Sequence, residues 1–282
     1  MKLGIALITY SRRERALATL AALLRHTNTP ATWCVADDGS QDGTTDAIRH
    51  CHLSIPVLSG ENRGVAWNKN RALWHLRACD VVLLVEDDAS PTENGWERDW
   101  IAATERHGHM NLNGDWFRGG IVSGSGTVAD PYASQGTSAQ VCGFSREALE
   151  HVGYFDTRFR GYGMGHIEHT HRLIRAGYGG CVVSGELGDY DGWQLGTETA
   201  FQVHRRPAPQ VLTYLLTSPI HVTHEHTHRD PCPAKQAANE ARFAELVRGQ
   251  VYRAPWSCDG EVAAFRAEMA KAARGTLAAG VA

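Results

Sequence analysis

Two short runs of acidic residues carry the clearest chemistry in this sequence. The runs are Asp37-Asp38-Gly39-Ser40 and Glu86-Asp87-Asp88, and each follows directly after an apolar segment. Carboxylate oxygens are preferred ligands of Mg²⁺ and Mn²⁺, and a divalent cation can neutralise a diphosphate leaving group. Asp-Gly-Ser alone is also ordinary turn chemistry, but a second acidic run after an apolar segment weakens that interpretation. Together the runs indicate a site for a phosphate-containing ligand and a metal ion.

Histidines form a second group with chemical potential. Of the 15 histidines, several fall into two short clusters, His166/His169/His171 and His224/His226/His228. Imidazole titrates near neutral pH and is a common metal ligand, so each cluster is a candidate acid, base or metal site. If the second cluster is a strand, its alternating histidines share one face, which is also a zinc-like arrangement.

The acidic runs lie at the ends of predicted strands. Apolar runs predict strands over 3–8, 31–36, 55–58 and 81–85, and helical spacing predicts helices over 14–26, 44–51 and 66–77. This alternation predicts a parallel sheet with crossover helices. Ligands of such sheets bind outside the carboxyl ends of the strands, so the sheet would bring the two acidic runs to one edge.

The second half of the sequence predicts a less regular arrangement. We expect helices over 96–106, 145–151 and 167–176, a Gly/Asn-rich turn over 107–114, and strands over 121–128, 139–144, 181–183 and 211–216. Segment 185–209 has no periodicity and is interpreted as a functional loop or lid, in which Tyr190, Asp191 and Trp193 contact a sugar or anchor the loop. Ala-rich segments over 234–247 and 260–279 predict helices.

Composition limits the class of protein further. The chain has 282 residues, is 43% hydrophobic and carries a formal net charge of -3, which fits one large α/β core and gives no general attraction for nucleic acid or acidic membranes. Seven scattered cysteines without a Cys-x-x-Cys pair are typical of reduced thiols. The first apolar run is too short for a signal peptide, and no stretch approaches the ~20 residues of a membrane-spanning helix, so we expect a cytoplasmic protein.

Three segments resemble the donor half of family-2 glycosyltransferases in their order and spacing. They are IALITYSR at 5–12, VADDGSQDGT at 35–44 and NRGVA at 62–66. Glu86-Asp87-Asp88 stands where that family keeps its Asp-x-Asp-type metal motif, and residues 143–146 and 153–156 resemble its acceptor side. The resemblance covers residues 3–183.

The resemblance implies the GT-A fold, an α/β Rossmann-like architecture with a central, mostly parallel sheet flanked by helices and here a helical C-terminal extension. The implied glycosyltransferase domain spans 1–230, with a nucleotide-sugar donor half at 1–125 and an acceptor half at 126–230. The extension covers 231–282.

Donor-side roles follow from the same resemblance. Thr9 and Tyr10 would line the nucleobase pocket, and Asp38 would accept a hydrogen bond from a base such as uracil. Asp37 would assist Asp38 or orient the loop. The matched segments add two further nucleotide-side candidates, Arg12 and Asn62.

Phosphate and metal roles are implied for five residues. Arg63 and Lys69 are candidates for the diphosphate or ribose, and a solvated helix face is the alternative for both. Asp88 is the first candidate for the metal-bridging carboxylate, with Asp87 and Glu86 supporting the sugar or the metal.

The catalytic base departs from the family pattern. Residues 172–178, RLIRAGY, closely match the end of the family's catalytic helix, but Gly165 and His166 occupy the places of its acidic pair. Either His166 or Glu168, two residues further on, would take the proton from the acceptor hydroxyl. A carboxylate is the usual base, so we prefer Glu168. Its alternative role is a first-turn carboxylate stabilised by the helix dipole.

A downstream histidine completes the expected site. Many GT-A enzymes add such a histidine to the metal shell, so His224 is the first candidate to join Asp88 around the ion. An ordinary surface or packed histidine is the alternative.

The sequence therefore predicts a metal-dependent, inverting glycosyltransferase that uses Mn²⁺ or Mg²⁺. Its donor is a nucleotide-diphosphate sugar, with UDP favoured, and its acceptor hydroxyl is open: a glycan, lipid carrier, protein, metabolite or modified nucleobase. One alternative is a nucleotidyltransferase, which is disfavoured because no Gly-rich phosphate loop follows the first strand. The other is a catalytically silent nucleotide-sugar-binding module, motivated by the missing acidic pair.

Overall fold

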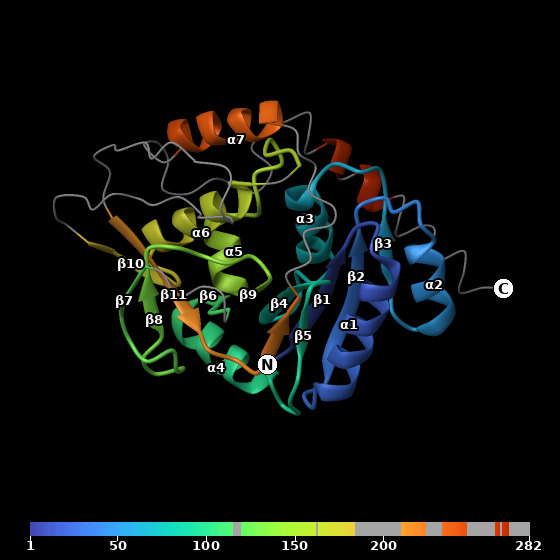
Figure 1. The fold of residues 1–282 in the computed structure, drawn as a ribbon, viewed down its shortest axis with the longest axis horizontal. Helices are drawn as coiled ribbons and strands as arrows, with labels where there is room; N and C mark the ends of the chain where they lie inside the picture. Colours follow the sequence, from blue (N-terminus) through green and yellow to red (C-terminus); the bar gives the residue numbers. More distant parts are fainter. Residues whose placement is uncertain are drawn as a thin grey trace.

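A large mixed sheet forms the centre of the molecule. The computed structural model describes residues 1–114, 120–161, 163–183, 210–223, 233–246, 263–265 and 267–270. The sheet has ten strands in the order β3-β2-β1-β4-β9-β6-β11-β8-β7, and β10 pairs with β11 outside this path (Figure 1). A second, two-stranded sheet pairs β12 with β5.

The strands of the large sheet are β1 (Leu3–Thr9), β2 (Ala31–Asp37), β3 (Val57–Ser59), β4 (Val81–Glu86), β6 (His109–Leu112), β7 (Ile121–Ser123), β8 (Tyr132–Ser134), β9 (Val141–Ser145), β10 (Gly180–Val183) and β11 (Gln210–Leu216). The small sheet consists of β5 (Ala89–Pro91) and β12 (Ile220–Val222). The helices are α1 (Arg13–His26), α2 (Thr44–Cys51), α3 (Val65–His75), α4 (Glu97–His107), α5 (Arg146–Val152), α6 (Gly165–Arg175) and α7 (Pro233–Leu246).

The first half is a parallel α/β unit, as the alternating sequence pattern predicts. Strands β1, β2, β3 and β4 all run parallel, and α1, α2 and α3 lie between them along the chain. Strand β9 then pairs antiparallel with both β4 and β6, which joins the parallel unit to the mixed second half. The α/β class and the GT-A-like arrangement of a mostly parallel sheet flanked by helices are confirmed.

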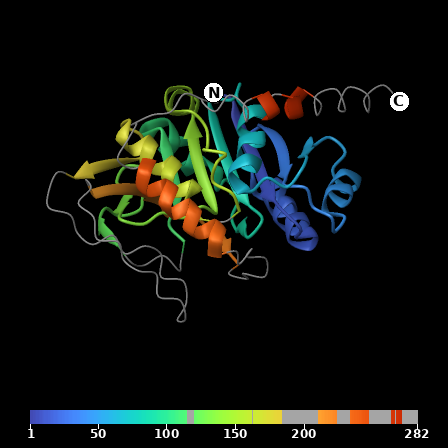
Figure 2. The same cartoon turned by 90° about the horizontal axis from the view of Figure 1, so that it is seen from above.

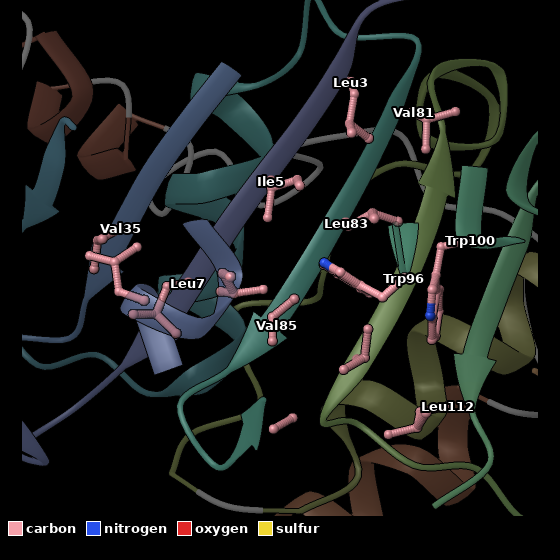
Figure 3. Close-up of a cluster of buried hydrophobic side chains, with 14 of the residues drawn as sticks. Leu3, Ile5, Leu7, Val35, Val81, Leu83, Val85, Trp96, Trp100 and Leu112 are labelled. Carbon is pink, nitrogen blue, oxygen red and sulfur yellow. The ribbon is translucent and has the colours of Figure 1, made fainter. Parts of the chain in front are cut away.

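Helices cover both faces of the sheet because alternate residues of each buried strand point to opposite sides. One face carries Leu3, Ile5 and Leu7, and packs with Val35, Leu83 and the indoles of Trp96 and Trp100 (Figure 3). Buried residues of α1 and α4 complete this cluster. The opposite face packs against α3, α5 and α6 through a second cluster, which includes Ile8, Leu84, Leu73, Leu149 and Leu173.

Strand register brings the acidic runs to one edge of the sheet. Thr9 of β1 pairs with Asp37 of β2, and Ile8 pairs with Glu86 of β4. Backbone hydrogen bonds continue this pairing beyond the strand ends. The Asp38 N–H donates to the Thr9 carbonyl at 3.1 Å, and the Asp87 N–H donates to the Ile8 carbonyl at 3.1 Å. The expectation that the parallel sheet brings both runs together is therefore met.

Two predicted boundaries in the second half are wrong. The sequence predicts a turn over 107–114, but Gly108 alone turns the chain with a φ of +77°, and His109–Leu112 is the buried strand β6. The polar residues of this segment favour a loop when only the sequence is considered. In the fold, hydrogen-bond partners from distant parts of the chain satisfy these residues, so they lie in a buried strand. The strand expected over 121–128 ends at Ser123, since Ser125 and Thr127 both donate backbone hydrogen bonds to the Asp130 carbonyl and form a turn.

The C-terminal segments pack back onto the domain. Helix α7 lies beside α6, where the rings of Phe243 and His171 contact at 5.5 Å (Figures 1 and 2). Phe265 lies edge-on to Trp67 of α3 at 5.3 Å and is fully buried. In the described part of the chain, no helix is both long and apolar enough to cross a membrane. The cytoplasmic location and the domain boundary at residue 230 stay predictions.

Candidate functional site

Asp37 builds the loop after β2. Its side chain is buried and accepts hydrogen bonds from the hydroxyls of Ser40, Thr45 and Ser59, the last two at 3.0 and 2.8 Å, and from the Ser40 N–H at 3.0 Å. Ser40 Oγ in turn accepts from the Ser11 N–H at 2.7 Å. Both oxygens of Asp37 are therefore engaged inside the protein, and the carboxylate joins the ends of β1, β2 and β3.

Asp38 holds the loop after β3. Its Oδ1 accepts from the Arg63 N–H and from Arg71 Nη1, both at 3.0 Å, and its Oδ2 accepts from the Gly64 N–H at 2.8 Å. Burial raises the pKa of Asp38, and the bonds from Arg63, Arg71 and Gly64 oppose that rise. Asp38 thus shapes the 62–64 segment expected at the nucleotide.

Glu86 and Lys69 form an ion pair at the end of β4. Lys69 Nζ lies 2.7 Å from Glu86 Oε1 and donates to the Ala139 carbonyl at 3.2 Å. Burial acts to lower the pKa of Lys69, but the charge and hydrogen bond of Glu86, together with the charges of Cys142 and Asp88, outweigh burial and the pKa is raised. Only 1% of the lysine side chain is exposed. Lys69, expected at the diphosphate, thus lies beneath Glu86 and neutralises it.

Asp87 is held by β1 and the residues that follow it. Its Oδ2 accepts from Thr9 Oγ1 at 2.7 Å, its Oδ1 accepts from Arg12 Nη1 at 2.9 Å, and its backbone carbonyl accepts from Thr19 Oγ1 at 2.9 Å. Burial raises the pKa of Asp87, and the bonds from Thr9 and Arg12 oppose that rise. Three expected site residues, Thr9, Arg12 and Asp87, are therefore in direct contact.

Asp88 differs from its two acidic neighbours because one oxygen of its carboxylate is buried without a hydrogen-bond partner in the described part of the chain. This oxygen is Oδ1, for which none of the described residues provides a hydrogen bond. Burial, together with the charges of Glu86 and Asp87, raises the pKa of Asp88 to about 7. Among the described residues, no three His, Cys, Asp or Glu side chains come together as a metal-binding group.

The small sheet brings a distant segment to Asp88. Strand β12 pairs antiparallel with β5, with Val222 opposite Ala89, and the Thr223 N–H donates to the Asp88 carbonyl at 2.7 Å. His224 follows Thr223 but lies outside the described residues, as do His226 and His228 and the expected lid residues Tyr190, Asp191 and Trp193.

Three expected nucleotide contacts lie around the strand-end carboxylates. Tyr10 follows β1 and 42% of it is exposed, and Asn62 is exposed in the loop that Asp38 holds. Arg63 stacks over Trp67, with its guanidinium carbon 4.5 Å from the ring centroid, and donates to Glu61 at 3.0 Å. These side chains keep polar or aromatic surface available at the edge of the sheet.

The two candidate bases differ sharply in their surroundings. Glu168 is buried on α6, and both of its carboxylate oxygens accept from Arg172, at 2.8 and 2.9 Å. His166, in the first turn of α6, bonds through Nε2 to Asn111 Oδ1 at 2.9 Å, while its buried Nδ1 has no hydrogen-bond partner among the described residues. Glu168 is thus part of an ion pair, whereas His166 keeps an unused nitrogen.

Arg71 is a residue of the site that sequence reasoning missed. It is fully buried on α3 and donates to Asp38 Oδ1 and, at 2.7 Å, to the Glu61 carbonyl. Its Nε donates to Glu268, whose other oxygen accepts from Trp67 Nε1 at 3.1 Å. The positions of Lys69 and Arg71 in the sequence do not indicate this role of Arg71, because its hydrogen-bond partners lie up to 197 residues away along the chain.

The fold and the site define the class: an α/β domain whose parallel strands end in carboxylates arranged for a phosphate-containing ligand. The family model described as glycosyl transferase family 2 matches residues 5–175. The chain therefore belongs to glycosyl transferase family 2.

Individual similarities are more distant. The uncharacterised glycosyltransferase YfnE of Bacillus subtilis strain 168 is 29% identical over 92 residues, which cover 31% of this chain and 23% of that protein. The match thus spans about a quarter of the length of this curated relative.

Solved structures share the fold at low sequence identity. The mannosyltransferase PcManGT from Pyrobaculum calidifontis, in complex with GDP-Man and Mn²⁺, has a TM-score of 0.59 at 17% identity and is covered over 75% of its chain by 100% of this one. GalNAc-T7 with UDP, GalNAc and Mn²⁺ has a TM-score of 0.59 at 10% identity, over 87% of this chain and 48% of that one.

Proposed function

We propose that this glycosyltransferase moves a sugar from a nucleotide-diphosphate donor, with UDP as the favoured nucleotide, to an acceptor hydroxyl with inversion at the anomeric carbon. The observation that carries the proposal is the contrast at the end of β4. Glu86 and Asp87 are paired with Lys69 and Arg12, whereas Asp88 Oδ1 is buried with no hydrogen-bond partner from the residues that the structure describes. A buried carboxylate oxygen of this kind is costly unless a ligand satisfies it.

The donor nucleotide would bind at the carboxyl ends of β1, β2 and β3. The exposed ring of Tyr10 offers a stacking surface for the base, and Thr9 shapes the pocket through its bond to Asp87. Asn62 and Arg63 line the loop that Asp38 holds by two backbone bonds. Arg12 and Arg63 are the cations that we assign to the ribose or diphosphate, and Asp37 orients the loop.

A divalent cation, Mn²⁺ or Mg²⁺, fits the unpaired oxygen of Asp88. Asp88 and His224 would hold the ion, with Asp87 in support and with phosphate oxygens completing the shell. His224 is chosen because it follows Thr223 in the sequence, and the Thr223 N–H donates to the Asp88 carbonyl. When bound, the ion supplies charge neutralisation for the departing diphosphate. The structures of PcManGT and GalNAc-T7 both contain Mn²⁺.

Proton removal from the acceptor is assigned to His166 in preference to Glu168. Arg172 bonds to both oxygens of Glu168, and protonation of that carboxylate would break a buried ion pair. His166 Nδ1 has no such competing partner within the described ranges. A base in direct displacement leads to inversion, since the acceptor oxygen attacks from the face opposite the leaving diphosphate.

The test is a transfer and hydrolysis assay with a panel of UDP and GDP sugars, in the presence of Mn²⁺ or Mg²⁺ and after chelation. We expect release of nucleoside diphosphate with at least one donor and its loss on chelation. Asp88→Asn should abolish release, whereas the matched control Asp46→Asn, whose side chain is 90% exposed, should leave it unchanged.

Two outcomes would overturn the proposal. Nucleotide-sugar binding without turnover for every donor would favour the silent binding module. Release of pyrophosphate from a nucleoside triphosphate and a sugar phosphate would favour nucleotidyl transfer.

A further inference from the structure

A chain of three polar side chains runs beneath the start of α6. His109 and Asn111 lie on β6 with 0% exposure, and Asn111 reaches His166 on α6. His109 Nδ1 lies 2.8 Å from the Gly143 carbonyl oxygen, and His109 Nε2 lies 3.0 Å from Asn111 Nδ2. Asn111 Oδ1 lies 2.9 Å from His166 Nε2. The four groups form one continuous line from β9 to the first turn of α6.

The donor and the acceptor of every hydrogen bond in this line follow from the first bond, between His109 and the Gly143 carbonyl. A carbonyl oxygen only accepts, so His109 carries its proton on Nδ1. Burial lowers the pKa of His109 to about 4, so the ring is neutral and its Nε2 is an acceptor. The Asn111 amide must then present its NH₂ group to His109, and the same NH₂ group donates to Thr213 Oγ1 at 3.2 Å. Asn111 Oδ1 is left facing His166, whose Nε2 must therefore carry the proton.

This order of donors fixes which nitrogen of His166 is basic. With the proton on Nε2, the lone pair lies on Nδ1, the buried atom for which the described part of the chain offers no hydrogen-bond partner. The ring itself is held from another side by Phe155, which stacks on it at a centroid distance of 6.2 Å. A single tautomer and a single unused lone pair are what a general base requires.

We propose that Asn111 and His109 are positioning residues that lock His166 in its Nε2–H tautomer, so that Nδ1 takes the proton of the acceptor hydroxyl. The inference rests on the proposed glycosyl transfer. In the step, the acceptor O–H proton moves to Nδ1 while the acceptor oxygen forms a bond to the anomeric carbon. The bond from that carbon to the donor's phosphate oxygen breaks, and its electron pair leaves with the nucleoside diphosphate. Asn111 Oδ1 then stabilises the imidazolium through the Nε2–H bond.

The groups around His166 keep this base unprotonated at neutral pH. Burial lowers its pKa well below the ordinary value, and Lys69 on α3, His109 on β6 and His169 on α6 act in the same direction. A hydrogen bond with the backbone of Ser138, before β9, acts in the opposite direction. No carboxylate is among these groups. An aspartate at position 111 would supply one, and would raise the pKa of His166.

Histidine tautomers can be read directly by long-range ¹H–¹⁵N NMR on protein labelled with ¹⁵N-histidine, with His166 assigned by the signal lost in His166→Gln. We expect the neutral Nε2–H pattern for His166 in the native protein at pH 7. In Asn111→Leu the pattern should become a mixture of tautomers. The matched control Thr213→Val removes the other partner of the Asn111 amide, and should leave the pattern unchanged. An Nδ1–H tautomer in the native protein would overturn the inference, whether or not any sugar is transferred.

Kinetics test the catalytic part separately. Asn111→Leu should lower kcat by at least about tenfold with little change in donor KM, because general-base contributions are large and donor contacts are untouched. Asn111→Asp should move the acid limb of the kcat profile to higher pH, a change that a purely structural role for Asn111 would not produce. Native-like kcat in Asn111→Leu, or an unmoved acid limb in a folded Asn111→Asp, would contradict the proposal. Failure of glycosyl transfer with every donor would instead contradict the proposed function and leave the tautomer result standing.

Discussion

Arg172 donates to both carboxylate oxygens of Glu168, at 2.8 and 2.9 Å, one turn along the buried face of α6. Arg172 also donates to the carbonyls of Val152 and Tyr154, at 2.8 and 2.9 Å. The pair therefore ties α6 to the end of α5 and the residues after it. This contact separates the two candidate bases, because an ion-paired carboxylate holds the helix in place whereas the unpaired nitrogen of His166 is free to accept a proton.

We expect Glu168→Gln and His166→Gln to fail in different ways. Glu168→Gln leaves Arg172 without its counter-charge and should lower the free energy of unfolding by about 3 kcal/mol, while kcat at a temperature where the variant is folded changes little. His166→Gln should lower kcat by about a hundredfold or more at nearly native stability. Chemical denaturation and steady-state kinetics on both variants measure the contrast, and a reversed pattern would restore Glu168 as the base.

Lys69 provides a second test, because the structure pairs it with Glu86 whereas the sequence predicts that it binds the diphosphate. If Lys69 neutralises Glu86, Lys69→Met should lower the free energy of unfolding by about 3 kcal/mol, because it leaves a carboxylate of low exposure unpaired. Adding Glu86→Gln in the same chain should recover much of that loss. If Lys69→Met keeps native stability and only its donor KM rises, Lys69 binds the diphosphate, as the sequence predicts.

Residues from the C-terminal end of the described chain should affect nucleotide binding. Glu268 bonds to Arg71 and Trp67, and Arg71 in turn holds Asp38 and the Glu61 carbonyl. Glu268→Gln should therefore weaken binding of the nucleoside diphosphate several-fold by calorimetry, whereas the exposed control Glu245→Gln should not. Equal affinities would mean that the loop keeps its shape without Glu268.

Phe265 tests how far the contact between the C-terminal segment and α3 stabilises the fold. Its ring is fully buried between Trp67 and Trp74, at centroid distances of 5.3 and 6.2 Å. Truncation of such a ring typically costs about 3 to 5 kcal/mol, so Phe265→Ala should lower the melting temperature markedly. An unchanged melting temperature would show that this contact contributes little to the folded state.

Buried histidines should make the protein sensitive to mild acid. Burial lowers the pKa of His109 and His171 to about 4, and that of His169 well below the ordinary value of 6.5. Below pH 6.5 these histidines are protonated in the unfolded chain but stay neutral in the folded chain. The free energy of unfolding should therefore fall by about 1.4 kcal/mol per pH unit for each histidine.

Thermal unfolding between pH 7.5 and pH 5.5 measures this effect. The melting temperature should drop steadily below pH 6.5, and His171→Leu, which removes one of these buried histidines, should show a shallower drop. A melting temperature that stays constant over this range would mean that the histidines are protonated in the folded state.

Local sequence determined the donor half of this protein. Apolar runs of strand length, helical spacing between them and acidic residues at the strand ends predict β1 to β4 and α1 to α3 to within a few residues, because the buried parallel strands and amphipathic helices leave strong local patterns. The two acidic runs follow from the same patterns, since parallel strands must end at one edge of the sheet.

Only the tertiary structure decided what each carboxylate and imidazole does. Asp88 is distinguished from Glu86 by Lys69, which lies on a different helix, and His166 from Glu168 by Asn111, which lies on a strand that the sequence presents as a turn. Hydrogen-bond partners far apart along the chain leave no periodic signal, yet they determine which polar groups are satisfied and which remain available for a substrate, a metal ion or a proton.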